Sequence, residues 1–281
     1  MSTVTNTDQP TASRASFVPT GSGLTFSGVL RSESIKLWSL RSTYWSFSLV
    51  VVASLGIAVL MALAITSGYD SASGTAMGVN GPQLFVLAAT AGLGLGQLIV
   101  AVLGVLSISG EYSSGMIKST LTAVPNRLPA LFAKVAVLFT FTFLVGLLSV
   151  VGSYLVAIPI LGAKDISANL FDADVYLPLL GNVLFLALIA VFAIGIGTIV
   201  RSSAGGIATV LGILLLLPTV VALFSMLVEW VQDIMPFLFT SAGSEMITPN
   251  TMESWQGFLV VLAWVVVSLG AAALLLKRRD A

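Results

Sequence analysis

Six long stretches of the sequence consist almost entirely of apolar residues, and they constrain the fold more than any other feature. Crossing about 30 Å of hydrocarbon takes about 20 helical residues at about 1.5 Å each. The stretches are too long and too uniformly apolar for β-barrel strands of about ten alternating residues. We therefore predict an all-α integral membrane protein with six transmembrane helices. They run approximately over Trp45–Thr66, Gln83–Ser109, Pro129–Ile158, Tyr176–Val200, Gly205–Val228 and Trp255–Leu276.

The composition indicates that lipid, not water, surrounds most of this apolar surface. The chain of 281 residues is 57% hydrophobic and only 9% charged, whereas a soluble domain has roughly a quarter charged residues. It contains neither cysteine nor histidine, which removes the usual zinc, haem and iron–sulfur ligands and the Ser/His and Cys/His nucleophile pairs. We therefore predict that this chain has no catalytic residue, no metal site and no bound cofactor.

The basic residues predict which side of the membrane each connection faces. Cytoplasmic connections of membrane proteins carry an excess of Lys and Arg. If the chain crosses six times, eleven of its twelve basic residues fall on one side, and Lys164 alone falls on the other. Both termini are then cytoplasmic, and Ser67–Pro82, Leu161–Val175 and Glu229–Ser254 are external. Eight acidic residues share the external side with Lys164: Asp70, Asp165, Asp172, Asp174, Glu229, Asp233, Glu245 and Glu253.

The region before the first span divides into two parts. Residues 1–23 are polar and rich in Ser, Thr and Pro, which predicts a disordered cytoplasmic tail. Residues 24–44 mix apolar and basic side chains and include a tryptophan. We expect them to form a helix at the headgroup boundary, with or without a protein partner. Residues 45–281 then form the transmembrane domain.

The cytoplasmic connection after the second span, Gly110–Lys134, is longer than a simple link requires. Gly110 and Gly115 allow the chain to turn, and Pro125 lies at a second turn. Between these turns Met116–Ala123 can form a short, partly apolar helix. Such a helix is either a docking element for another chain or part of an ordinary connecting loop.

The predicted spans contain almost no ionisable side chains, and this limits the energy source. Lys134 and Arg201 lie near cytoplasmic helix ends, where we expect them to snorkel towards water. Proton-coupled and ion-coupled carriers usually need a charged residue within the membrane. The sequence also has no GxxxxGK[ST] phosphate-binding loop. If ATP drives this protein, another chain must bind the ATP.

Glycines and prolines predict how the helices pack and where they bend or end. Gly92 and Gly96 lie four residues apart, a spacing that lets two helix backbones approach closely. Pro218 is expected to kink the fifth span, and Pro159 to end the third. Between the fifth and sixth spans, Ile234–Phe239 is either a short helix dipping into the outer leaflet or a loop with a few apolar anchors.

Two motifs resemble a known family. They are SESIKLWSLRSTYW, from Ser32 to Trp45, and GEYSSGMIKSTLTAVPNRLPALFAK, from Gly110. Permease subunits of bacterial ATP-binding-cassette (ABC) transporters, in the type-2 exporter superfamily, carry a similar run before the first span and a similar segment after the second helix. The resemblance covers essentially the whole chain from about Leu24, and the two motifs together are more specific than the apolar spans.

This resemblance implies an architecture, partners and site residues. It implies a homodimer or a pair of similar six-helix permeases in the cell membrane, served by two copies of a cytoplasmic ATPase that hold ATP and Mg. It also implies an N-terminal interface helix along the membrane and a coupling helix that docks on the ATPase. The interface residues would be Glu33, Lys36, Leu37, Trp38 and Arg41; the coupling residues would be Glu111, Tyr112, Ser113, Ser114, Gly115, Met116, Ile117 and Lys118.

The implied function is export of a drug, lipid or peptide-like substrate, and rival functions stay open. An ABC-type sensor or immunity protein without net transport would share the fold, because a fold does not fix a function. A secondary transporter or small channel would need intramembrane carboxylates or a polar helix stripe, and neither is evident. An intramembrane enzyme would need acid–base pairs within the spans, and the sequence has none there.

Overall fold

The computed structural model describes residues 25–69, 81–116, 128–248 and 253–278, and this part of the chain contains helices and no strand. The predicted coupling residues Ile117 and Lys118 and the predicted tail lie outside these ranges. The described helices, including one π-helix (η1) and one 3-10 helix (η2), are α1 Phe26–Ser39, α2 Arg41–Ser67, α3 Gly81–Thr90, α4 Leu93–Ser113, α6 Leu128–Gly162, α7 Ala173–Val200, α8 Ser203–Leu211, η1 Gly212–Leu216, α9 Leu217–Ser225, η2 Glu229–Phe237, α10 Phe239–Ile247 and α11 Ser254–Arg278.

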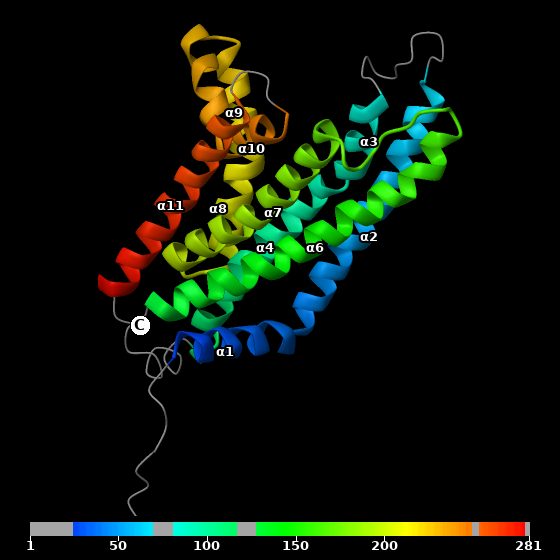
Figure 1. The fold of residues 1–281 in the computed structure, drawn as a ribbon. Coiled ribbons are helices and arrows are strands. Elements are labelled where there is room, and N and C mark those ends of the chain that lie inside the picture. The colour runs from blue at the N-terminus through cyan, green and yellow to red at the C-terminus, as the bar shows by residue number, and fades with distance from the viewer. Residues whose placement is uncertain (1–24, 70–80, 117–127, 249–252, 279–281) are drawn as a thin grey trace, which may run out of the picture.

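The prediction of six membrane-length helices is confirmed. Six helical segments of the described chain are long and apolar enough to cross a membrane, so the chain is a multi-pass membrane protein. Two of them are composite, because α3 and α4 together form the second and α8, η1 and α9 together form the fifth. The spans other than the fifth run side by side in one bundle (Figure 1).

The fourth span, α7, lies inside the bundle, and small residues let its neighbours approach it. A Cβ added to Gly104 of α4 would lie 2.8 Å from the Ala190 carbonyl oxygen of α7. Gly92 and Gly96 lie on α4 where it packs against α2. A Cβ at Gly92 would overlap the Ser54 backbone, and one at Gly96 would lie 3.3 Å from the Val50 side chain. Backbone contacts of this kind account for van der Waals packing between apolar helices in lipid.

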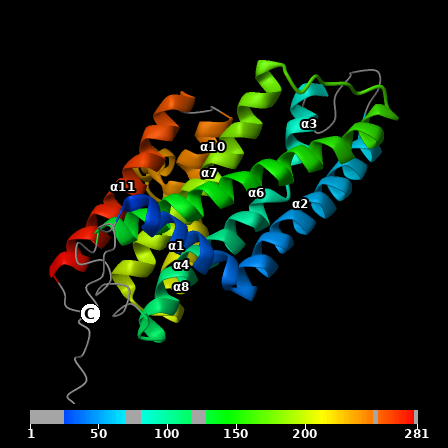
Figure 2. The same cartoon turned by 60° about the horizontal axis from the view of Figure 1, so that its bottom comes forward.

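Helix α1 crosses one end of the bundle and does not follow the direction of the spans (Figures 1 and 2). The Thr25 side chain caps its first turn by accepting a hydrogen bond from Gly28 N at 3.3 Å. Leu40 is extended and forms the corner between α1 and α2. The predicted boundary at residue 44 therefore moves back to Leu40, and Arg41, predicted in the interface helix, begins the first span.

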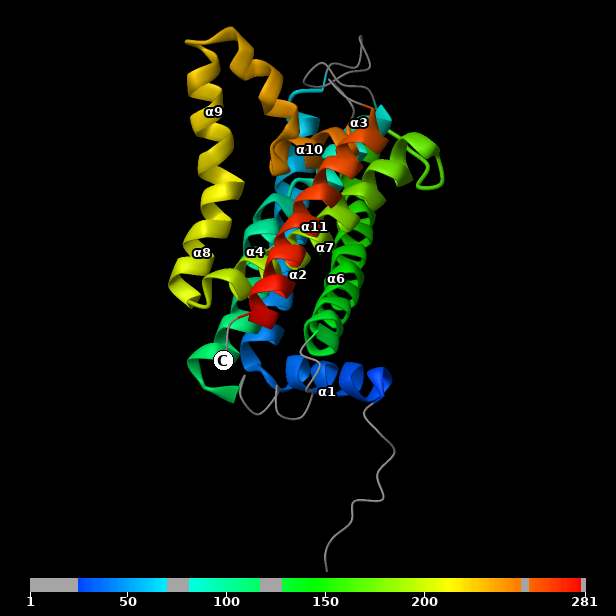
Figure 3. The same cartoon turned by 90° about the vertical axis from the view of Figure 1, so that its left-hand side faces the viewer.

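The fifth span stands apart from the rest of the bundle over much of its length (Figure 3). Its middle is the π-helix η1, and Pro218 follows in the first turn of α9. A change of helix type therefore precedes Pro218, at the position where a kink was predicted. Pro159 does not end the third span, because α6 continues to Gly162. A proline in the last turn removes only one backbone hydrogen bond, which explains why the helix survives it.

The connection between the fifth and sixth spans is more ordered than the sequence suggested. Its apolar part belongs to the 3-10 helix η2, so the short-helix alternative for Ile234–Phe239 is the better description up to Phe237. Helix α10 follows and was not predicted at all. Trp264 of α11 donates a hydrogen bond from Nε1 to the Phe237 carbonyl at 3.0 Å and fixes the corner between η2 and α10.

Candidate functional site

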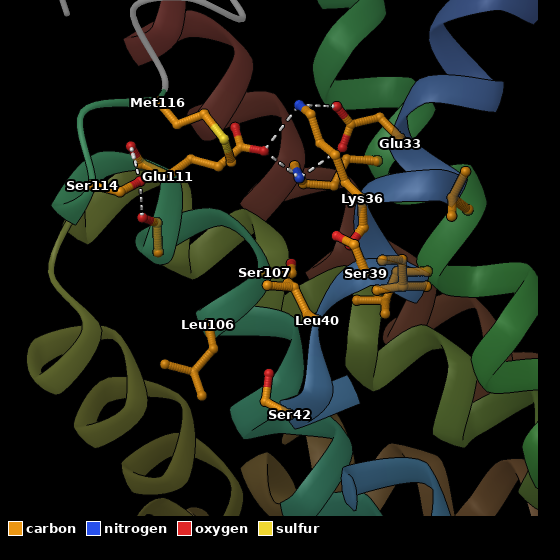
Figure 4. A pocket seen from close by; sticks show the side chains of 15 residues that line it. Glu33, Lys36, Ser39, Leu40, Ser42, Leu106, Ser107, Glu111, Ser114 and Met116 are labelled. Atoms are coloured by element: carbon orange, nitrogen blue, oxygen red, sulfur yellow. Dashed lines mark hydrogen bonds and ion pairs between the residues drawn. The ribbon is translucent and has the colours of Figure 1, made fainter. Parts of the chain in front are cut away.

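Four charged side chains from three helices meet at the end of the bundle that α1 crosses (Figure 4). We call these residues, Glu33 and Lys36 of α1, Glu111 of α4 and Lys134 of α6, the ion network. Lys36 Nζ lies 2.7 Å from Glu33 Oε1 and 3.3 Å from Glu111 Oε1. Lys134 Nζ lies 2.8 Å from Glu33 Oε2 and 2.9 Å from Glu111 Oε1. Each ammonium therefore bridges the two carboxylates.

The local sequence explains how α1 brings its charges to this point. Val29, Glu33 and Leu37 are spaced four residues apart, so they share the face of α1 that packs on the bundle. Val29 and Leu37 are buried with Glu33. Lys36 lies one helical turn after Glu33, next to this buried face. Glu111 is in the last turn of α4, and Lys134 is in the second turn of α6.

The network is largely withdrawn from solvent. Glu33 is 3% exposed, Glu111 4% and Lys134 9%. An ion buried without a partner costs several kcal/mol of desolvation, so these charges depend on one another. The network therefore does not add a large net stability. It does fix how α1, α4 and α6 are joined, because removing one charge would leave the remaining buried charges without a full set of partners.

The network shifts two pKa values on α1. Burial alone would raise the pKa of the Glu33 carboxyl, but the positive charges and hydrogen bonds of Lys134 and Lys36 outweigh it. The pKa of Glu33 is therefore lowered. Burial alone would lower the pKa of the Lys36 ammonium, but Glu33 and Glu111 outweigh it and raise that pKa. Both groups are consequently charged at neutral pH.

A cavity of about 580 Å³ adjoins the network, between α1, the corner at Leu40, α4 and α6. The four network residues line one part of it. Apolar side chains and serine hydroxyls line the remainder, and Figure 4 shows Leu106 and Ser42 well away from the carboxylates. Besides the network, the lining residues are Leu37, Ser39, Leu40, Ser42, Leu106, Ser107, Gly110, Ser114, Met116, Val137 and Leu138.

The end of α4 is also held on its other side. The Arg201 guanidinium lies 5.1 Å from the centroid of the Tyr112 ring, at cation–π distance. Arg201 has a left-handed backbone, with φ of 55°, and forms the turn between α7 and α8. Just after it, Ser203 Oγ lies 3.0 Å from Ser109 Oγ. Consecutive residues of α4, Glu111 and Tyr112, thus contact opposite parts of the bundle.

The predicted coupling residues divide by exposure. Glu111 is buried in the network and Tyr112 is half-buried, whereas Ser113, Ser114, Gly115 and Met116 are exposed. Gly115 has a φ of +72°, a left-handed conformation that favours glycine and lets the chain leave α4. In this conformation the Glu111 carboxylate is not at the surface, so the exposed part of the predicted docking segment begins at Ser113.

The predicted interface residues divide in the same way. Glu33 and Leu37 face the bundle, Lys36 is half-buried, and Trp38 and Arg41 are exposed. The Trp38 ring still contacts α6, with its centroid 5.1 Å from that of Phe141 in an edge-on arrangement. The predicted helix therefore presents one face to the protein and leaves the other free for its surroundings.

The network itself was not predicted, and the expectation for Lys134 was wrong. Lys134 does not snorkel: its side chain is buried and pairs with two carboxylates. Its partner Glu33 lies 101 residues away in the sequence. The available signal was that Glu33 and Glu111, near the predicted cytoplasmic ends of the first and second spans, stand among an excess of basic residues with which they can pair.

Comparison with known proteins does not show a family for this chain. No protein-family model matches the sequence, and no curated protein matches it. The resemblance of the two motifs to ABC permeases therefore stays a prediction, and the function has to be argued from the residues themselves.

Proposed function

We propose that the chain is the transmembrane permease subunit of a bacterial ABC exporter. In this proposal it pairs with a second copy or with a similar permease in the cell membrane, with both termini in the cytoplasm. Two copies of a cytoplasmic ATPase bind ATP and Mg and supply the energy. The cargo is a drug, a lipid or a peptide-like molecule.

One observation carries the proposal: the central parts of the six spans contain no Asp, Glu, Lys or Arg. Within the described spans these residues occur only in the first two turns or the last turn, as Arg41, Glu111, Lys134, Asp174 and the pair that ends α11. A carrier driven by protons or ions usually needs a charged coupling site within the membrane. A chain that has no such site and no phosphate-binding loop needs an external source of energy.

The ion network suggests how force from an ATPase would enter the bundle. The ATPase would press on the exposed segment that begins at Ser113, the last residue of α4. Because Glu111 is bonded to Lys36 and Lys134, displacement of the end of α4 would carry α1 and the start of α6 with it. The contact between Tyr112 and Arg201 would pass the same displacement to the turn between α7 and α8.

This path changes the expected role of Glu111. It acts as a positioning residue through the network, and first contact with the ATPase falls to Ser113, Ser114 and Met116. Replacing Glu111 would then uncouple ATP hydrolysis from transport by loosening α1 and α6 from α4. Loss of transport with unchanged capture of the ATPase is the result expected for Glu111→Gln.

Co-purification tests the proposal. The tagged full chain, isolated from its own cells in mild detergent, should retain a chain that has a GxxxxGK[ST] loop and hydrolyses ATP. Vesicles containing both chains should then show ATP-dependent flux. Retention without flux would support a sensor or immunity protein, and flux by this chain alone would contradict the proposal.

A matched pair of variants locates the contact. Ser113→Trp adds bulk to an exposed position at the end of α4 and should abolish capture of the ATPase. Gln232→Trp adds the same bulk to an exposed position in η2, at the opposite end of the bundle, and should leave capture unchanged. Equal capture by both variants would show that the segment after α4 does not dock the ATPase.

A further inference from the structure

The described lining of the cavity beside the ion network carries no net charge. The network contributes two ammonium groups and two carboxylates, which pair with one another. The rest of the lining consists of apolar side chains, serine residues and one glycine. A charged head group that entered this space would lose hydration and gain no counter-charge, because each network charge is already paired. The cavity therefore favours an uncharged ligand.

The cavity has the size of a small-molecule site and reaches the surface of the chain. Its volume of about 580 Å³ lies within the range of about 300–1,000 Å³ that is common for such sites. Leu40, Leu106 and Met116 belong to its lining and are also exposed. Covering apolar side chains in a concave site is favourable. An occupant with an apolar body would cover these three side chains.

Two serine hydroxyls of the lining offer acceptors to a ligand. A hydroxyl has one proton to donate and two lone pairs with which to accept. Ser107 Oγ donates to the Gly104 carbonyl oxygen at 2.7 Å, and Ser39 Oγ donates to the Lys36 carbonyl oxygen at 2.8 Å. Both protons are therefore used within the helices, and the lone pairs stay available. Ser107 is half-buried and Ser39 is exposed, so a donor from a ligand competes less with water at Ser107.

We propose that the cavity binds an uncharged amphiphile with a hydroxyl group, which donates to Ser107 Oγ while the apolar chain lies against Leu40 and Leu106. Figure 4 shows Ser107 between the network and Leu106, so a head group at Ser107 leaves the apolar part of the cavity to the chain. Both the donor and the absence of charge match the lining.

The position of the cavity favours an amphiphile over a small soluble alcohol. The cavity lies at the corner between α1, which crosses the end of the bundle, and α2, the first span. This corner is where a head group and an apolar chain would separate at the membrane surface. The same chemistry is found in two sources, a diacylglycerol of the membrane and a free long-chain alcohol. The inference does not depend on the proposed transport function.

Equilibrium binding to the purified full chain in phosphatidylcholine nanodiscs tests the chemistry. Radiolabelled dodecanol should show a saturable component above that of protein-free nanodiscs. Dodecyl methyl ether, which keeps the oxygen but has no proton to donate, should compete about two- to tenfold less well than unlabelled dodecanol. Dodecyltrimethylammonium and dodecyl sulfate should each compete at least about tenfold less well. No saturable component, or an ether or charged competitor equal to dodecanol, would overturn the proposal.

Two tryptophan variants locate the chain of the ligand. Leu106→Trp narrows the apolar part of the cavity and should remove the saturable component. Leu95→Trp, on the same helix at another exposed leucine outside the described lining, should keep it. Thermal unfolding checks that both variants are folded. Unchanged dodecanol binding in Leu106→Trp would overturn the site.

Two serine variants locate the hydroxyl of the ligand. Ser107→Ala should weaken dodecanol about two- to tenfold and leave dodecyl methyl ether unchanged, so that the two ligands bind alike. Ser39→Ala removes a hydroxyl with the same kind of backbone bond at an exposed position, and should keep the preference for dodecanol. A preference that survives Ser107→Ala would overturn Ser107 as the acceptor.

Native mass spectrometry separates the sources. The full chain released from nanodiscs of phosphatidylcholine, phosphatidylglycerol and dioleoylglycerol should retain dioleoylglycerol, and Leu106→Trp should lose it. Saturable dodecanol binding without retained dioleoylglycerol supports the site with a free long-chain alcohol as its ligand. Preferred retention of phosphatidylglycerol, lost in Leu106→Trp, would overturn the assignment of an uncharged head group.

Discussion

The fourth and fifth spans are equally apolar in sequence, yet they occupy opposite environments. In α7, 78% of the most apolar stretch is buried within the chain, whereas in the fifth span only 11% of that stretch is buried. Helix α9 has no buried residue at all. Apolar composition therefore identifies a span, but it does not say whether the span contacts protein or its surroundings.

The difference between these spans lies in small residues and aromatic contacts. Gly195 and Gly197 of α7 face the backbones of α11 and α4, and Phe192 stacks on Phe239 of α10 with centroids 4.6 Å apart. The fifth span places leucines outward at Leu215 and Leu216 and is interrupted by η1. In lipid there is no hydrophobic driving force between helices, so they associate through close packing.

The largest predicted effect compares two phenylalanines. Phe192→Ala removes a buried ring between Phe239 and Trp264 and should lower the free energy of unfolding by about 3–5 kcal/mol. Phe224→Ala, on the exposed face of α9, should change it by less than about 0.5 kcal/mol. Unfolding in detergent micelles, titrated with dodecyl sulfate, measures both. Similar losses at the two positions would contradict the difference in burial.

The next effect compares two glycines. A Cβ at Gly195 would lie 2.9 Å from Ser268 Cβ and 3.0 Å from its backbone carbon, so Gly195→Ala should cost about 1–3 kcal/mol. A Cβ at Gly212 in η1 would meet nothing within 4 Å. Gly212→Ala should be neutral or stabilising, since alanine is the better helix former by up to about 1 kcal/mol. The same titration measures this pair, and equal destabilisation would count against close packing at α7.

A smaller effect belongs to the junction between η1 and α9 in the fifth span. Pro218 has no N–H to donate to Leu214 O, and Thr240 of α10 donates to this carbonyl instead, with Oγ1 at 3.1 Å. Thr240→Val should therefore cost about 0.5–1.5 kcal/mol. Thr219→Val is the control, because the Thr219 hydroxyl bonds only within its own span, to Leu215 O. A larger loss for Thr219→Val would show that the bond from α10 does not stabilise this junction.

The smallest predicted effect is the change in the free energy of unfolding with pH. It distinguishes the contribution of the charged side chains from that of packing. Because the pKa of Glu33 is lowered in the folded state, its contribution is present above its ordinary pKa of 4.5 and is lost as the pH falls through the lowered value. The pKa of Lys36 is raised, so its contribution is present below 10.5 and is lost as the pH rises through the raised value.

Unfolding measured against pH in neutral detergent checks this behaviour. The wild type should show a plateau across neutral pH and lose stability in strong acid and strong base. Glu33→Gln should lose most of the acid dependence, while Phe192→Ala should lower the plateau and keep its shape. If Glu33→Gln loses stability in acid in the same way as the wild type, the groups responsible for the acid dependence lie outside the network.

The sequence predicted those features that depend on local composition. The six spans follow from length and hydropathy, and a helix before the first span follows from the mixture of apolar and basic residues around Lys36. Pairing between Glu33 and Lys134 could not be predicted, because it depends on where two helices far apart in sequence meet. Helix α10 was missed because Phe239–Ile247 is short and mixes Ser, Thr and Glu with apolar residues, so it has neither the length nor the periodicity of a clear helix.

The candidate site divides in the same way, into features set by local sequence and contacts between distant segments. Glu111 was predicted just after the second span and lies instead in its last turn. Its burial was not predicted, because burial depends on two lysines from other helices. The cavity had no signal in the sequence, since its lining comes from separate segments. The small residues of α7, Gly195 and Gly197, were visible in the sequence, but the exposed fifth span also contains Gly205, Gly206 and Gly212. Glycine content alone therefore did not indicate which span lies inside.

Single-cysteine labelling tests the central claim that the end of α4 faces the cytoplasm, where an ATPase can reach it. The chain has no natural cysteine, so Ser113→Cys and Gln232→Cys each introduce one reactive thiol at an exposed position. A membrane-impermeant maleimide should label Gln232→Cys in intact cells and Ser113→Cys only in inverted vesicles. Labelling of Ser113→Cys in intact cells would contradict the account, because that end of the bundle, with its ion network, would then lie outside the cell.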